Sequence, residues 1–185
     1  MDNDKQYFLS GLFTEMSKAE KAYSELLAMG YKPEEVNVAM ASTTRDKLQA
    51  AEMQIGTPET ALDQKYDGTI DGGITGGLLG SIAFTIGALG SNLLIPGLGL
   101  VVMGPLAAGL LGAGAGGLTG GIIGKLLSPG APEPQSELIT QGLKNGKIML
   151  ALVPRNAQEE KAIHAKWTAL DAEIFQKPID NKLHD

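Results

Sequence analysis

The chain has 185 residues, with 15 lysines and arginines against 21 aspartates and glutamates, and its formal net charge is −6 at pH 7. This acidic balance argues against nucleic acid as a partner, because binding to phosphates needs clustered cations. The chain has no cysteine, which excludes disulfides, thiolate zinc sites and cysteine nucleophiles. Its first residues lack the basic and apolar regions of a signal peptide, so we expect a cytosolic start.

The first segment, residues 1–56, has the apolar periodicity of one β-α-β unit followed by a short helix. Alternating apolar residues predict strands over 6–13 and 35–41. Apolar residues at helical spacing predict a helix between these strands, over about 15–29, and a second helix is expected over 43–55.

The segment 135–180 repeats this alternation of helices and strands. In chain order the pattern predicts a helix, a buried strand, a helix and a last strand, over residues 135–145, 147–153, 157–172 and 173–179. Asn156 is a candidate cap for the second of these helices, and Trp167 is expected in the core. Pro178 predicts that the last strand lies at an edge of the sheet.

Together the two segments match an α+β fold, the ferredoxin-like split βαβ pattern. Between them the sequence divides into a polar linker (57–71), an apolar block (72–128) and a proline-rich linker (129–134), and residues 181–185 form a tail. We interpret the block as an insertion between the second and third strands of the domain, whose two ends lie close together.

The apolar block carries no charged residue between Asp71 and Lys125. The sequence Ile-Pro-Gly-Leu-Gly interrupts it near its middle, and its residues Pro96, Gly97 and Gly99 predict a hairpin turn. Two helices, roughly 72–94 and 100–127, are then expected on either side. A helix needs about 20 apolar residues to cross a bilayer, so each is long enough to span a membrane.

Glycines in the block recur every four residues, which places them on one helix face. The second predicted helix has Gly112, Gly116, Gly120 and Gly124, and the first has Gly72, Gly76 and Gly80, with Gly73 and Gly77 on the neighbouring line. Such a line is a groove without side chains, where two helices pack closely. Two interpretations remain open: a zipper inserted in a membrane, or a hairpin buried between the subunits of a soluble oligomer.

The stretch from GGITGG to GGIIGKL, with IPGLG and GPLAAG inside it, resembles the glycine-rich insert of bacterial general-stress proteins, which are heat- or low-temperature-induced. In that family a run ending in two glycines four apart, here Gly142 and Gly146, precedes a strand and an acidic helix. The proline-rich linker and the sequence after Phe175 depart from the family. The resemblance implies an association with stress and membranes, and it carries over no catalytic residues.

Residues that could support chemistry do not form a recognisable constellation. His164 is on a charged helix near Lys161 and Lys166, and His184 is in the tail, so neither is expected to be a metal ligand. A Gly-x-Gly-x-x-Gly match beginning at Gly112 has no strand before it. Ser91 and Asn92, deep in the block, are compatible with a hairpin turn or with a polar ring in a pore. The sequence therefore predicts no catalytic residue, no cofactor and no metal site.

The function expected from these patterns is that of a non-enzymatic, stress-associated membrane protein that self-assembles through its glycine zipper. It would stabilise, remodel or permeabilise the cytoplasmic membrane, with both termini in the cytosol. The partners expected are further copies of the chain and membrane lipid, and a small-molecule ligand is left open. The alternative is a soluble, cytoplasmic homo-oligomer with a ligand-binding or regulatory role that buries the hairpin between subunits.

Overall fold

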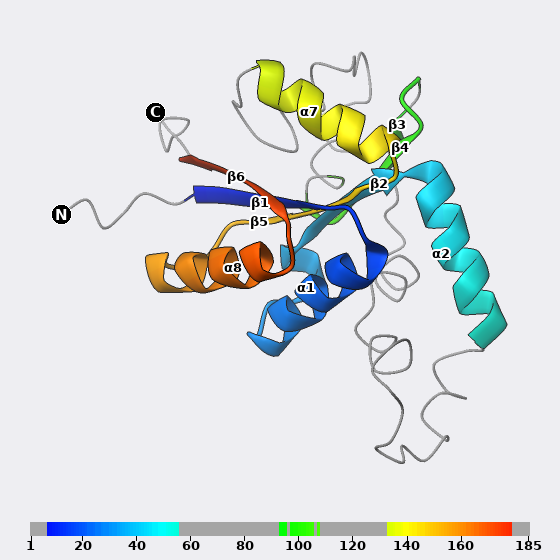
Figure 1. Ribbon diagram of the computed structural model, residues 1–185. Coiled ribbons are helices and arrows are strands. Elements are labelled where there is room, and N and C mark those ends of the chain that lie inside the picture. Colours follow the sequence, from blue (N-terminus) through cyan, green and yellow to red (C-terminus); the bar gives the residue numbers. More distant parts are fainter. Residues whose placement is uncertain (1–6, 56–92, 96, 106, 108–132, 179–185) are drawn as a thin grey trace.

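The computed structural model describes residues 7–55, 93–95, 97–105, 107 and 133–178 (Figure 1). Within these ranges the protein has an α+β fold, in which four α-helices accompany a six-stranded antiparallel sheet. The elements are β1 (Tyr7–Phe13), α1 (Met16–Ala28), the 3-10 helix η1 (Pro33–Glu35), β2 (Asn37–Ala41), α2 (Ser42–Ile55), β3 (Leu93–Ile95), β4 (Leu100–Met103), α7 (Glu133–Lys144), β5 (Ile148–Leu152), α8 (Ala157–Ala169) and β6 (Glu173–Pro178).

The strand order is β3-β4-β2-β5-β1-β6, and every neighbouring pair is antiparallel. β1 therefore lies between β5 and β6, although β5 is far from it in sequence. The predicted edge position of the last strand is confirmed, because β6 ends the sheet on one side. β3 ends it on the other side.

Helices cover both faces of this sheet. Figure 1 shows α1 and α8 side by side on one face, which we call the α1/α8 face, and α7 across the opposite face, which we call the α7 face. Because successive side chains of a strand point to opposite faces, the strands other than β3 supply both cores. In β1, Leu9 and Phe13 belong to the α1/α8 core, and Phe8 and Leu12 belong to the α7 core.

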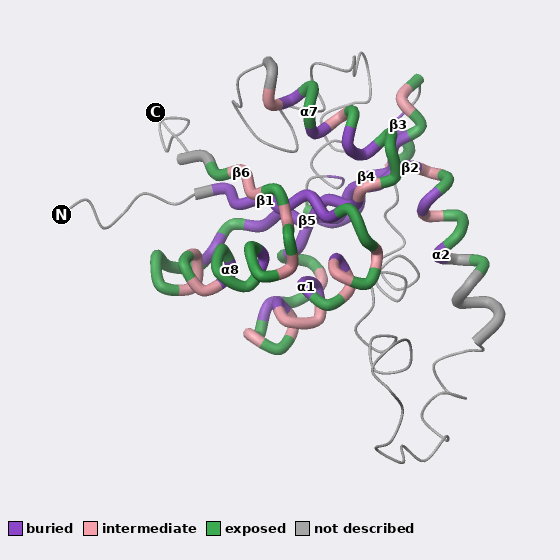
Figure 2. Tube along the Cα trace, viewed as in Figure 1, coloured by how far each residue is buried: buried purple, intermediate pink, exposed green. Residues whose placement is uncertain are grey.

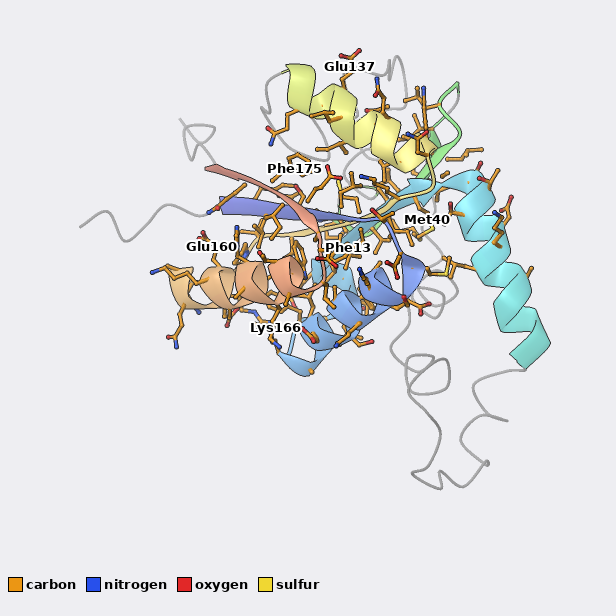
Figure 3. All side chains as sticks on the ribbon, in the orientation of Figure 1. Phe13, Met40, Glu137, Glu160, Lys166 and Phe175 are labelled. Carbon is orange, nitrogen blue, oxygen red and sulfur yellow. The ribbon has the colours of Figure 1, made fainter. Side chains whose placement is uncertain are left out.

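The α1/α8 core is built around large aromatic side chains. Trp167 of α8 is buried and meets Phe13 edge to face, with ring centroids 5.7 Å apart and an interplanar angle of 82°. Figure 3 labels Phe13 on this side of the sheet. The indole lies on Gly11 of β1, where an added Cβ would be 2.6 Å from the Trp167 Cε3 atom. A glycine in mid-strand is therefore required for this close contact.

The α7 core is built from smaller side chains. Ala39, Ala41 and Ala151 of the central strands are buried in this core together with Ile139 and Leu143 of α7. Figure 2 shows the buried stretches along α7 and the central strands. The helix approaches the sheet at Gly142, where an added Cβ would be 2.6 Å from Leu12 Cδ2. Small residues on both sides therefore allow α7 to lie close to the strands.

The helix ends agree with the sequence patterns to within a few residues. The predicted cap of α8 is confirmed, since Asn156 Oδ1 accepts hydrogen bonds from the backbone N–H groups of Gln158 and Glu159 at 3.0 and 2.9 Å. α7 begins at Glu133, two residues inside the segment predicted as a proline-rich linker. Pro134 is compatible with this start, because the first turn of a helix does not need its N–H. The linker 57–71, the tail 181–185 and residues 129–132 lie outside the described residues.

Candidate functional site

The centre of the uncharged block is a β-hairpin. Two helices were predicted over 72–94 and 100–127, and this prediction is wrong at β3 and β4, which are strands. β4 is buried along its whole length and pairs with β2, with Ala41 opposite Leu100 and Val38 opposite Met103. A short apolar run does not distinguish a buried strand from a buried helix by periodicity. The sequence Leu-Val-Val-Met beside a Pro-Gly turn is the signal that could have identified the strand.

The turn of this hairpin contains two of the three residues predicted for a turn. The N–H of Leu98 donates to the Ile95 carbonyl at 3.3 Å, and Gly97 and Gly99 have φ angles of +81° and +62°. The carbonyl of Gly99 accepts from the N–H of Ser42 at 2.8 Å, which ties the turn to the start of α2. The turn therefore joins two strands docked on the domain. Pro96 lies outside the described residues.

The chain leaves β4 through a crowded glycine. Gly104 has a φ angle of +96°, which residues with a side chain rarely adopt. An added Cβ there would be 2.5 Å from the Val36 carbonyl oxygen and 3.0 Å from the Asn37 Cα atom. Asn37 is buried, and its Nδ2 donates to the Ala151 carbonyl at 3.1 Å. Gly104 thus brings the end of β4 against the start of β2.

The membrane-spanning hairpin expected from the sequence is corrected by this geometry. Its apex would have to lie across the bilayer from the domain, whereas the apex is part of the domain's own sheet. In the part of the chain that the structure describes, no helix has the length and apolar character needed to cross a membrane. The nine zipper glycines, Gly72, Gly73, Gly76, Gly77, Gly80, Gly112, Gly116, Gly120 and Gly124, lie outside the described residues.

The two edges of the sheet differ in their chemistry. At β6, Glu173 forms an ion pair with Lys147, and Gln176 donates to Glu160 of α8, which Figure 3 labels. At β3 the three residues are Leu, Leu and Ile, and Leu94 is 50% exposed. Charges and proline protect an edge strand from pairing with another chain. β6 has these features and β3 lacks them.

A polar cluster ties the loop after α1 to the loop before α8. The Tyr31 hydroxyl donates to Glu159, and the Arg155 guanidinium lies over the Tyr31 ring at 4.2 Å from its centroid. Arg155 also donates to the Gly30 carbonyl at 2.7 Å and to a Glu35 carboxylate oxygen at 3.1 Å. Each of these interactions joins residues that are far apart in sequence, so the cluster fixes the two loops together.

The protonation states in this cluster favour a structural role. Burial, together with the hydrogen bond to Glu159, raises the pKa of Tyr31 to about 12. The backbone N–H of Lys32 and the Arg155 guanidinium hold the pKa of Glu35 below its usual range. A neutral phenol and a paired carboxylate are poor proton acceptors near neutral pH. We therefore assign the cluster to the stability of the fold.

No metal or acid-base site emerges from the other titratable residues that are described. His164 is exposed on α8, where the Thr168 hydroxyl lies 3.4 Å from its Nδ1 atom. Among these residues, no group of three or more histidine, aspartate or glutamate side chains could hold a metal ion. The strongest candidate for an interaction site is accordingly the β3–β4 hairpin, whose strand β3 is the last strand of the sheet among the described residues.

Comparison with protein-family models, curated proteins and solved structures finds no significant match for this chain. The resemblance to general-stress proteins therefore stays a prediction.

Proposed function

We propose that this protein is a non-enzymatic homo-oligomer that buries its uncharged, glycine-rich sequence between subunits. The observation that carries the proposal is the pairing of β4 with β2, which holds the centre of the uncharged block in the sheet of the domain. The first glycine-rich segment is flanked by α2 and β3, and the second is flanked by β4 and α7. Each segment is therefore bounded at both ends by described elements of the same domain.

The composition of these segments supports burial against another copy. Residues 72–124 contain no charge and are rich in leucine, isoleucine and glycine. Large contiguous apolar surfaces on a protein usually mark an interaction site. Glycines spaced four apart permit close approach of two backbones, and glycine costs about 1 kcal/mol per residue in an exposed helix. Close packing between subunits would offset that cost.

We propose further that the parts outside the block form a ferredoxin-like split βαβ domain. Two observations support this: the strands β2, β5, β1 and β6 are adjacent in that order, and α1 and α8 lie on the same face. In this proposal β3 and β4 extend the sheet beyond β2. The resemblance to bacterial general-stress proteins adds stress as the setting in which the assembly acts.

The experiment that tests the function measures the molar mass of the purified full-length chain by light scattering over a wide range of concentrations. A defined oligomer is expected for the wild type. Gly116→Leu combined with Gly120→Leu fills the glycine line and should dissociate it. The matched control, Ala115→Leu with Thr119→Leu, has the same spacing but lies off that line, and should leave the mass unchanged.

Folding of each variant is checked by circular dichroism and by the fluorescence of Trp167, which reports the α1/α8 core. A monomeric wild type at all concentrations would overturn the proposal. An oligomer that resists the glycine substitutions but not the control substitutions would show that the glycine line is not the contact.

A further inference from the structure

We propose that β3 is a self-pairing edge, at which two copies of the chain join their sheets across a twofold axis. The inference rests on the proposed homo-oligomer, and it names the strand that sets the register between two subunits. β3 is the last strand of the sheet, paired on one side with β4, and the described elements contribute no strand beyond it. Figure 1 shows β3 and β4 at the end of the sheet away from β6.

The side chains of β3 make this edge apolar on both faces. Leu93 and Ile95 pair with Val102 and Leu100 and contribute to the α7 core. Leu94 pairs with Val101, so its side chain is on the opposite face, where it is half exposed. An uncharged edge strand that offers free backbone groups is a template for pairing with another strand.

Charge decides which partner fits. The sequence carries no charge for more than twenty residues on either side of β3, so a charged strand would lose solvation there without gaining a partner. The other edge of this chain is unsuitable, because β6 carries Glu173 and ends at Pro178. A second β3 matches fully: in antiparallel pairing centred on Leu94, each Leu93 lies opposite the other copy's Ile95, and the two Leu94 residues lie opposite each other.

The contact is short, since each strand contributes three residues. A stable interface usually buries about 1,600 Å² in total, which three residues a side cannot supply. The pairing of β3 therefore orients two copies, and the apolar segments invoked in the proposed function supply most of the buried area. We therefore expect a single charge at Leu94 to weaken the pairing of two subunits and to have little effect on the fold of each subunit.

The test uses the full-length chain and compares Leu94 with a matched leucine. Leu138 on α7 is 58% exposed, against 50% for Leu94, but it is remote in sequence from the edge and lies on a helix. Leu94→Lys places two like charges opposite each other at the twofold axis, which is destabilising. Its apparent dissociation constant should rise about tenfold or more, whereas Leu138→Lys should leave that constant unchanged.

A mixture provides the specific signature of twofold pairing. Leu94→Lys and Leu94→Glu should each weaken association alone, and mixing them in equal amounts should restore it, because the two opposite charges then face each other. The chain has no cysteine, so Leu94→Cys adds a single thiol. Directly opposite residues in antiparallel strands have Cα atoms about 4.5–5.5 Å apart, within disulfide range, and mild oxidation should therefore crosslink Leu94→Cys much faster than Leu138→Cys.

The outcomes separate this inference from the function on which it rests. An oligomer that is dissociated by the Gly116/Gly120 double substitution, but is insensitive to Leu94→Lys and is not crosslinked through Leu94→Cys, would overturn the edge pairing and leave the proposed function standing. A chain that is monomeric throughout would overturn both. The pairing is supported if association is restored in the mixture of Leu94→Lys and Leu94→Glu and if Leu94→Cys crosslinks fast.

Discussion

The two faces of the sheet are built differently. On the α1/α8 face, helices from the first and last parts of the chain enclose Trp167, Phe13 and other large side chains. On the α7 face the strands carry alanines, a single described helix lies across them, and the hairpin of the uncharged block contributes Ile95, Leu100 and Val102. β4 also supplies Val101 and Met103 to the first core. Among the described residues, the second core takes a larger share of its side chains from the block and from the helix that follows it.

A buried hydroxyl adds to this contrast. Ser136 of α7 is 5% exposed, and within the described structure its Oγ atom has no hydrogen-bond partner. A buried hydroxyl without a partner costs about 1–3 kcal/mol. The α7 face therefore contains a buried hydroxyl without a described partner. On the α1/α8 face, by contrast, the buried hydroxyl of Tyr31 donates a hydrogen bond to Glu159.

The largest effect is expected from removing the block. Deleting residues 56–132 and joining Ile55 to Glu133 through a glycine-serine linker removes β3, β4 and their share of the α7 core. Burying each large aliphatic side chain contributes about 1.5–3 kcal/mol, so the loss is comparable with the whole stability of a domain, about 5–15 kcal/mol. Circular dichroism and a thermal melt should detect an unfolded or molten chain. A cooperative melt close to that of the wild type would show that the α7 face does not need the hairpin.

The next effect compares one large residue from each core. Trp167→Ala should destabilise the protein by about 3–5 kcal/mol and Ile139→Ala by about 2–5 kcal/mol, because both side chains are buried and each leaves a cavity. Urea unfolding of the two variants measures the difference. If the α7 core relaxes around a cavity more readily than the α1/α8 core, the loss of stability in Ile139→Ala should be near the lower end of its range, about 2 kcal/mol. Equal losses at the upper ends would contradict the proposed difference in packing.

The sequence predicted the α1/α8 face more successfully than the α7 face, for a physical reason. The helix that carries Tyr23 has clear apolar periodicity, the two buried residues of α8, Ile163 and Trp167, are four apart, and the position of β6 follows from Pro178. The run of residues at β4 is apolar on every side because both faces of that strand are buried, so it lacks the alternation that identifies a half-buried strand. Pairing between β4 and β2 is a long-range contact, and no local pattern encodes it.

A smaller effect compares two glycines with the same crowding. An added Cβ would be 2.6 Å from the Trp167 ring at Gly11, and 2.6 Å from the end of the Leu12 side chain at Gly142. The indole is rigid and held by Phe13, whereas a leucine methyl can move. Gly11→Ala should therefore cost about 1–3 kcal/mol. In Gly142→Ala a helix-propensity gain of about 1 kcal/mol offsets the crowding, so the net change should be near zero.

Urea unfolding of both alanine variants tests whether the same crowding lowers the free energy of unfolding by different amounts on the two faces. The control is Gly146→Ala, whose added Cβ has nothing within 4 Å but whose φ angle of +90° is unfavourable for a side chain. The loss of stability in Gly146→Ala therefore reports backbone strain alone. If Gly142→Ala were as destabilising as Gly11→Ala, the α7 face would be packed as rigidly as the other.

The smallest effect concerns Tyr31, a titratable residue of the α1/α8 core. Tyr31 is 3% exposed, and its pKa of about 12 exceeds the usual value of 10 for tyrosine. Because the folded state holds this proton more tightly than the unfolded chain, the contribution of Tyr31 to stability is fully present below pH 10 and is lost as the pH rises through 12. At neutral pH, Tyr31→Phe should cost about 1 kcal/mol through its lost hydrogen bonds.

The stability difference between wild type and Tyr31→Phe should therefore shrink between pH 10 and 12, which urea unfolding at a series of pH values can follow. Burial is the main cause of the raised pKa and the interaction with Glu159 the next. Glu159→Gln removes the charge while retaining an acceptor oxygen, so the decline should begin at the same pH but end at a lower pH in that variant. A constant difference between wild type and Tyr31→Phe across this range would mean that the hydroxyl has the same pKa in the folded and unfolded chains.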